Sequence, residues 1–165
     1  MAVPLVRPAT PGDAALIVSF IRGLAEYERM LDQVEATADS IRGSLFPADS
    51  TPVAHCVIGE LDGEPAGFAL YFYNFSTFVG RPGLYLEDLY VTPSHRGHGL
   101  GKAMLLHLAR LAHERECGRM EWSVLDWNAP AIAFYESLGA RRMNEWQLCR
   151  LTAADLGRLS GRGDV

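Results

Sequence analysis

The chain has 165 residues, of which 48% are apolar and 21% charged, and this composition is that of one ordinary globular domain rather than of a disordered or repetitive protein. Its net charge of −5 argues against nucleic acid as a partner, because proteins that bind phosphate backbones are usually basic. No apolar run approaches the roughly 18 residues that a membrane span needs, and no signal segment opens the chain, so we expect a cytoplasmic protein with no membrane role.

The first half of the sequence predicts a strand, two helices and a pair of hairpin strands. These elements are expected at Leu5–Arg7 and at residues 10–25, 37–45, 53–61 and 67–75. Thr10 has the features of an N-cap whose capping box is closed by Asp13, and Thr37 is placed to cap the second helix. Asp62-Gly63, between the two strand-like runs, is typical of a tight hairpin turn.

The second half alternates strands with helices. Strands are expected at residues 84–91, 119–125 and 146–151, and helices at 99–116 and 128–138. Gly139 is expected to end the helix at 128–138. This order indicates an α/β fold of the α+β kind, in which helices flank a mixed, mostly antiparallel sheet with one right-handed βαβ crossover. We expect residues 1–165 to form a single domain whose tail, residues 157–165, is frayed.

The cysteines and histidines predict no metal site. Cys56, Cys117 and Cys149 are odd in number, widely spaced and without a Cys-x-x-Cys pair, which favours reduced thiols over disulfides or zinc ligands. His107 and His113 lie on the expected third helix, where solvent exposure explains them better than ligation.

The most informative stretch joins the strand that ends at Val91 to the helix behind it. It places three glycines between two basic residues, in the order Arg96-Gly97-His98-Gly99-Leu100-Gly101-Lys102. Glycines leave no Cβ to keep a ligand off the backbone, and the first turn of a helix has N–H groups without acceptors. With the helix dipole, these features predict a phosphate site. The alternative is a glycine-rich turn that only starts a helix.

Spacing excludes two familiar phosphate loops. A Walker loop would need a glycine where Arg96 stands and a Ser or Thr where Ala103 stands. A dinucleotide loop would need Gly-x-Gly-x-x-Gly in a first βαβ unit, whereas this run is Gly-x-Gly-x-Gly in mid-chain. The pattern that does fit is Arg/Gln-x-x-Gly-x-Gly/Ala, met by Arg96, Gly99 and Gly101.

A second stretch, Trp122–Ala140, places an asparagine after a strand-like run and then a helix containing Phe134-Tyr135. Together the two stretches resemble the GNAT acetyltransferases, and within them the spermidine/spermine (diamine) and thialysine acetyltransferase group. Further matches carry the resemblance to that group, among them Val6-Arg-Pro-Ala-Thr10, Ala25-Glu-Tyr-Glu28, Tyr85-Leu-Glu-Asp88, Arg96-Gly97 and Val124-Leu-Asp-Trp-Asn128.

The resemblance implies the GNAT fold, with a sheet that splays at an acetyl-coenzyme A cleft, and transfer of the acetyl group to a primary amine of a small cationic substrate without a metal. It assigns the cosubstrate to Leu89, Tyr90, Val91, Arg96, Gly97, His98, Gly99, Leu100, Gly101, Lys102, Asn128, Ala131 and Tyr135. It assigns the acceptor amine to Tyr27, Glu28, Glu87, Glu121, Trp122 and Ser123. It also implies a homodimer.

The chemistry gives two of these residues catalytic roles. An alkyl amine with a pKa near 10.4 arrives protonated, so a carboxylate such as Glu87 must accept a proton, directly or through water. The thiolate leaving group has a pKa of about 8.5, and the hydroxyl of Tyr135 is a suitable acid for it. Backbone N–H groups near Leu89 would polarise the thioester carbonyl. Direct transfer in a ternary complex follows, without a covalent enzyme intermediate.

Each assignment has a structural alternative. Glu87 could only pair with a basic residue, Tyr135 could be a core aromatic, and Asn128 could be a plain N-cap or do both. Tyr27-Glu28 reads on propensity alone as a solvated pair at a helix end. Strand alternation sends Glu87 and Asp88 to opposite faces, so that only one of them can point into a cleft.

The resemblance departs from the diamine acetyltransferases in one loop. Phe75-Ser-Thr-Phe78 contains no carboxylate where those enzymes have one for a second cation, which favours thialysine, lysine-like amino acids or short diamines over spermine. Two other functions stay open: a GNAT enzyme for protein lysines or N-terminal amines, and a non-catalytic module that binds acetyl-coenzyme A.

Overall fold

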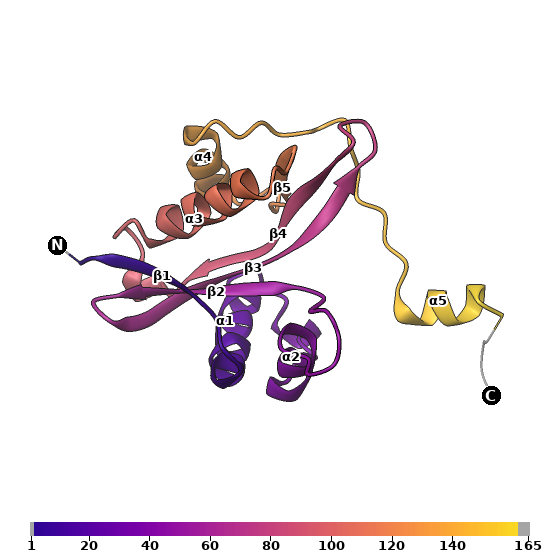
Figure 1. The fold of residues 1–165 in the computed structure, drawn as a ribbon, viewed down its shortest axis with the longest axis horizontal. Helices are drawn as coiled ribbons and strands as arrows, with labels where there is room; N and C mark the ends of the chain where they lie inside the picture. The colour runs from indigo at the N-terminus through magenta and orange to yellow at the C-terminus, as the bar shows by residue number, and fades with distance from the viewer. Residues whose placement is uncertain (1, 162–165) are drawn as a thin grey trace. The chain divides into compact units, whose positions relative to one another are not determined.

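A five-stranded sheet lies at the centre of the first of two units in the computed structural model, which describes residues 2–161 (Figure 1). The two units, 1–123 and 124–165, divide after Ser123. The strands are β1 Pro4–Pro8, β2 His55–Leu61, β3 Glu64–Ser76, β4 Arg81–Val91 and β5 Arg119–Trp122. Their spatial order is β1-β2-β3-β4-β5, and every neighbouring pair is antiparallel except β4 and β5, which are parallel. The mixed, mostly antiparallel sheet is therefore confirmed.

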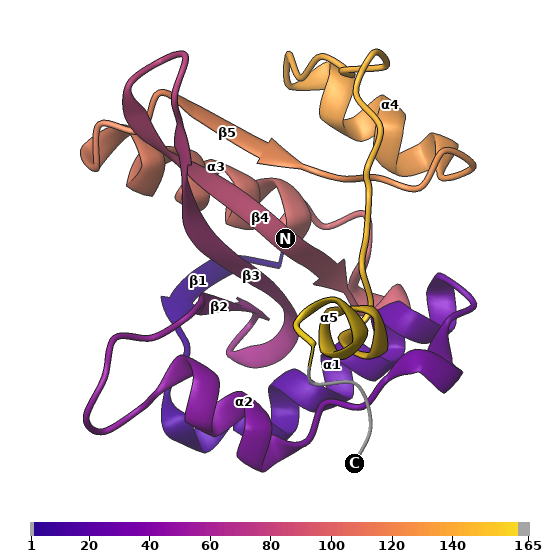
Figure 2. The same cartoon turned by 90° about the vertical axis from the view of Figure 1, so that its right-hand side faces the viewer.

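Helices cover both faces of this sheet. The first face carries α1 (Ala14–Tyr27) and α2 (Ala38–Leu45), and the second carries α3 (Leu100–Glu114) (Figures 1 and 2). Three 3-10 turns complete this unit: η1 Pro11–Asp13, η2 Leu31–Gln33 and η3 Pro93–His95. The core under α1 joins Ile17 and Phe20 of that helix to Ile58, Phe68 and Tyr90 of the sheet, all buried.

Local signals in the sequence set the boundaries of these elements. Thr10 and Asp13 form the expected capping box, and Thr37 accepts a hydrogen bond from the backbone N–H of Ser40 in a second one. The β2–β3 turn has φ of 52° at Asp62 and 85° at Gly63, the left-handed pair that a two-residue hairpin loop requires. These predictions are confirmed. They could be made from the sequence because each feature depends on residues only two or three positions apart.

The second unit contains α4 (Ala129–Ser137) and α5 (Ala153–Leu159), neither of which buries a residue. The strand expected at 146–151 is wrong, since no described strand pairs with this segment and Trp146 and Leu148 are 72% and 77% exposed. β5 likewise ends at Trp122, before the expected Leu125. A strand-like pattern forms a strand only where a neighbour supplies its hydrogen bonds. Helix α5 covers residues 157–159, where a frayed tail was expected, and residues 162–165 lie outside the described residues.

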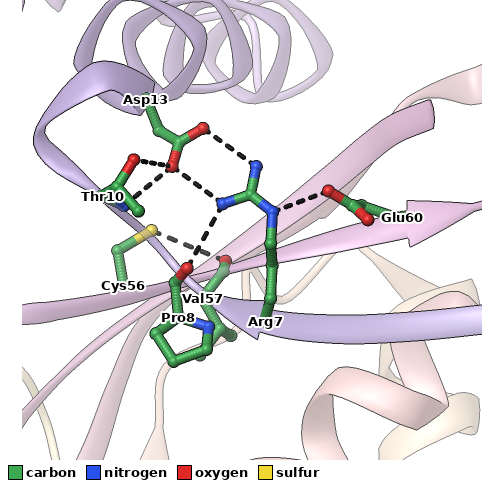
Figure 3. Close-up of polar contacts among 7 residues, drawn as sticks. All are labelled: Arg7, Pro8, Thr10, Asp13, Cys56, Val57 and Glu60. Atoms are coloured by element: carbon green, nitrogen blue, oxygen red, sulfur yellow. Dashed lines mark hydrogen bonds and ion pairs between the residues drawn. The ribbon is translucent and has the colours of Figure 1, made fainter. Parts of the chain in front are cut away.

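A network of charged side chains ties β1 to β2 and η1 (Figure 3). Arg7 Nε donates to Glu60 Oε1 at 2.7 Å, and the two terminal guanidinium nitrogens donate to the carboxylate of Asp13 at 2.8 and 3.0 Å. The same carboxylate accepts from the backbone N–H and hydroxyl of Thr10. The Arg7 guanidinium holds the pKa of Asp13 well below its usual range.

We predict that Arg7→Met lowers the free energy of unfolding by about 2 kcal/mol. The carboxylates of Asp13 and Glu60 are nearly buried, and the substitution removes the positive charge that both of them share. Arg42→Met is the matched control. Its ion pair with Asp39 is exposed, so we expect a loss below about 0.5 kcal/mol. Urea unfolding at pH 7 measures both, and equal losses would contradict the role of the network.

Candidate functional site

A β-bulge interrupts β4 in the middle of the sheet. Leu86 is opposite Tyr71 of β3 and Asp88 is opposite Leu70, so Glu87 is an extra residue without a partner on that strand. Leu70 packs against the core under α1, whereas the next residue, Tyr71, belongs to the opposite face. Asp88 therefore lies on the α1 face of the sheet and Leu86 on the opposite face, although residues two positions apart in a regular strand share a face. Simple alternation along β4 would not predict this arrangement.

The same point marks the end of pairing between β4 and β5. The register of these parallel strands runs from Gly83 opposite Arg119 to Leu86 opposite Trp122. Beyond Leu86, β4 continues along β3 to Val91 with no strand of residues 2–123 on its other side. The sheet thus offers an edge at Glu87–Val91 where an extended ligand could add as a strand does, which is where the cosubstrate was expected at Leu89, Tyr90 and Val91.

The glycine loop leads from this edge into α3. Gly97 and Gly99 both have φ of 81°, a conformation that side-chain-bearing residues rarely adopt, and a Cβ on either would enter open space. Gly99 is the N-cap of α3 and has no side chain to satisfy the first-turn N–H groups of Leu100, Gly101 and Lys102. The loop therefore presents uncapped N–H groups at the positive end of a 15-residue helix, which suits a phosphate.

Carboxylates gather on the α1 side of the bulge. Glu28 is the C-cap residue of α1 and half-buried, and burial raises the pKa of its carboxyl. Asp88 is half-buried, and burial, followed by the negative charges of Glu87 and Glu28, raises the pKa of its carboxyl to about 6. Glu87 itself is exposed. The three acids make no ion pair within residues 2–161, so a cationic ligand would supply the charge that this region lacks.

A second polar group lies on the same face of the sheet, beyond the bulge. Tyr85 stacks on Phe72 with ring centroids 5.1 Å apart, and its hydroxyl lies 2.9 Å from that of Ser123. Glu121 is opposite Tyr85 in the β4–β5 register and pairs with Arg119 at 2.8 Å. Trp122 is opposite Leu86 and so belongs to the other face. Of the expected pocket residues 121–123, Glu121 and Ser123 therefore both lie next to Tyr85.

Within the second unit, Asn128 and Tyr135 lie at the two ends of one short helix. The side chain of Asn128 accepts a hydrogen bond from the backbone N–H of Ala131 at 3.4 Å, so its reading as the N-cap of α4 is confirmed. Asn128 is also buried. Tyr135 lies against Phe134 with ring centroids 5.3 Å apart. The roles that the resemblance assigns to Asn128, Ala131 and Tyr135 stay predictions.

Two features of this site were missed by sequence reasoning. Asp88 was set aside because strand alternation allowed only one acid in the cleft, and nothing in the sequence marks the bulge. The contact of Arg96 with Tyr27 joins residues far apart in the chain, and its guanidinium carbon lies 4.8 Å from the ring centroid.

Comparison with known proteins identifies the class. The model of the acetyltransferase (GNAT) family matches residues 22–140. The thialysine N-epsilon-acetyltransferase of Bos taurus is 36% identical, over 98% of this chain and 100% of the relative. The L-ornithine N5-acetyltransferase of Arabidopsis thaliana is 33% identical, over 89% of this chain and 83% of the relative. An integron cassette protein of V. cholerae has the same fold, with a TM-score of 0.76 at 23% identity over 95% of this chain and 97% of its own.

The chain belongs to the GNAT acetyltransferase family, and the protein is an acetyltransferase. Members of this family use acetyl-coenzyme A. The residues present fit that group, because Gly97 and Gly99 leave the loop open and α3 presents its first-turn N–H groups there.

Among residues 2–161, no three His, Cys, Asp or Glu side chains are grouped as metal ligands would be. In the same range, no helix has the length and apolar character needed to cross a bilayer.

We predict that Asp88→Asn raises the free energy of unfolding by about 1–2 kcal/mol at pH 7.5 and by much less at pH 4. A carboxyl whose pKa is raised by folding is protonated in both states below its unfolded value of about 4, so it costs nothing there. As the pH rises from about 4 to about 6, the folded state becomes less stable relative to the unfolded state, because the unfolded carboxyl ionises more readily than the buried one. Urea unfolding at both pH values measures this. Asp49→Asn, at an exposed loop position, is the control, and an equal change with both variants would overturn the assignment.

Proposed function

We propose that this acetyltransferase moves the acetyl group of acetyl-coenzyme A to a primary amine of a small cationic substrate. Thialysine, lysine-like amino acids and short diamines are the first candidates. The observation that carries the proposal is the acidic region of Glu28, Glu87 and Asp88 beside an open strand edge that leads into the uncapped glycine loop before α3. The named activities of the relatives, on thialysine and on L-ornithine, concern small amines and support the same class of substrate.

The acids serve the chemistry of an ammonium. Burial and then the repulsion from Glu87 and Glu28 raise the pKa of Asp88, and a cation bound beside these acids would offset both effects. Binding of the ammonium and ionisation of Asp88 therefore favour each other. Glu87 is the proposed proton acceptor, directly or through water, because it is the exposed member at the bulge. The backbone N–H groups of the bulge are the proposed donors to the thioester carbonyl oxygen, since a bulge leaves backbone groups outside the regular ladder.

Tyr135 is the proposed acid for the thiolate leaving group, on the basis of the resemblance. Its hydroxyl gives a proton to the sulfur as the amine nitrogen bonds to the acetyl carbon and the carbon–sulfur bond breaks. Glu87 accepts the first proton, which the incoming ammonium gives up before the attack. The second proton, which the nitrogen loses as the amide forms, returns through water to the Tyr135 oxygen, so one proton remains on Glu87. No step needs an acetyl group on the enzyme, so the proposal is direct transfer in a ternary complex. A homodimer and a cytoplasmic location stay predictions from the sequence.

The first experiment is thiol release from acetyl-coenzyme A across thialysine, lysine, ornithine, putrescine, spermidine, spermine and one lysine peptide. We expect turnover on a small amine. Gly99→Glu should abolish it by adding bulk and negative charge to the phosphate loop, whereas Gly43→Glu, in α2 with open space around it, should leave it within about twofold. Turnover only on the peptide would select protein amines. Coenzyme binding without any turnover would select a non-catalytic module.

Kinetics of two conservative variants test the proton transfers. With the best amine of that panel, we expect Tyr135→Phe to lower kcat by about 10²-fold or more with little change in the affinity for acetyl-coenzyme A. Glu87→Gln should lower kcat/KM for the amine by a similar factor and change its pH profile. A wild-type profile for Glu87→Gln would remove Glu87 from the reaction, and trapping of an acetyl-enzyme without amine would contradict direct transfer.

A further inference from the structure

One side chain connects the glycine loop to the C-terminal turn of α1. The guanidinium carbon of Arg96 lies 4.8 Å from the centroid of the Tyr27 ring and 5.9 Å from that of the Tyr90 ring. Both distances are within the range of a cation–π contact. The Nε of Arg96 donates to the carbonyl of Val91 at 3.0 Å, so the base of the guanidinium is fixed to the end of β4.

Both rings are themselves tied to α1. Tyr27 is the last residue of the helix, and Gly23 lies one turn earlier on the same side. A Cβ on Gly23 would lie 2.5 Å from the hydroxyl oxygen of Tyr90, so this helix backbone approaches the Tyr90 ring as closely as only glycine permits. Arg96 therefore bridges two aromatic rings that α1 and β4 hold near each other.

This geometry differs from that of a simple phosphate ligand. A guanidinium that served only as a point charge for phosphate would need no hydrogen bond to the Val91 carbonyl and no stacking on Tyr27. The anion site has other sources of positive charge, namely the N-terminus of α3 and Lys102. The acceptor pocket, by contrast, has Tyr27 on an exposed helix end, where an aromatic side chain needs a neighbour to fix its orientation.

We propose that Arg96 is a positioning residue that couples the glycine loop to the acceptor pocket by holding the Tyr27 ring. The assignment of Tyr27 to that pocket rests on the proposed function. When coenzyme A orders the loop, Arg96 orders Tyr27, and the amine then binds a site that is already formed. Linkage requires the converse as well: a bound amine raises the affinity for coenzyme A by the same factor.

The test follows the Tyr27 ring directly, by fluorine NMR of protein labelled with 3-fluorotyrosine and assigned with Tyr27→Phe. In the wild type we expect coenzyme A to shift the Tyr27 resonance. In Arg96→Lys, which keeps the charge and loses the planar stacking group, we expect that response to disappear while the Kd for coenzyme A rises less than about threefold. Lys102→Met is the contrasting variant, in which the Kd rises further and the Tyr27 response at saturation is retained.

Kinetics give the second readout. With the best amine, Arg96→Lys should raise the KM for the amine about three- to fivefold, the size of a partly exposed cation–π contact, with kcat nearly unchanged. An intact Tyr27 response in Arg96→Lys, or a loss of coenzyme A affinity equal to that in Lys102→Met, would overturn the proposal and make Arg96 a phosphate ligand. The NMR result decides the coupling even if no amine is turned over, which would count against the proposed function alone.

Discussion

The end of β4–β5 pairing at Leu86 is the constraint on which the rest of the site depends. A parallel pair of strands that stayed in register to Val91 would satisfy the backbone groups along β4 and leave no edge for a ligand. Because the bulge at Glu87 occurs at the same position, the strand changes its facial alternation just where its outer edge becomes open. The end of β5 thus provides the edge, and the bulge at the same position turns Asp88 to the α1 side beside it.

Two groups of carboxylates in this protein have pKa values shifted in opposite directions. Asp13 and Glu60 are nearly buried and share Arg7, and the pKa of Asp13 is lowered accordingly. Asp88 is half-buried beside Glu28 without such a partner, and its pKa is raised to about 6. The first arrangement stabilises the fold, and the second opposes it at neutral pH. A bound cation would account for the presence of a carboxyl that destabilises the free protein, because the cation would neutralise its charge during function.

Sequence reasoning succeeded where the determinants are local. The capping boxes at Thr10 and Thr37, the hairpin turn at Gly63 and the glycine loop each depend on residues within a few positions, and the structure has them where they were expected. It failed where the determinant is a distant partner. The segment 146–151 has a strand-like pattern but no described strand beside it. The bulge is likewise defined only by the register against β3, so alternation along β4 alone could not show that Leu86 and Asp88, two residues apart, lie on opposite faces.

The distribution of charge along the hairpin of β3 and β4 bears on the choice of amine. Negative charge is concentrated at the bulge, in Glu87 and Asp88 near Glu28, whereas the turn end of the hairpin exposes Phe75 and Phe78, at 63% and 96%. Residues 81–88 span about 23 Å of β4 at 3.3 Å per residue, so the turn is too distant to share the cation at the bulge. A second ammonium that extended toward the turn would meet aromatic side chains without a carboxylate in 75–78. In the proposed reaction, the acids would therefore stabilise a positive charge close to the reacting amine, which favours lysine-like substrates and short diamines over long polyamines.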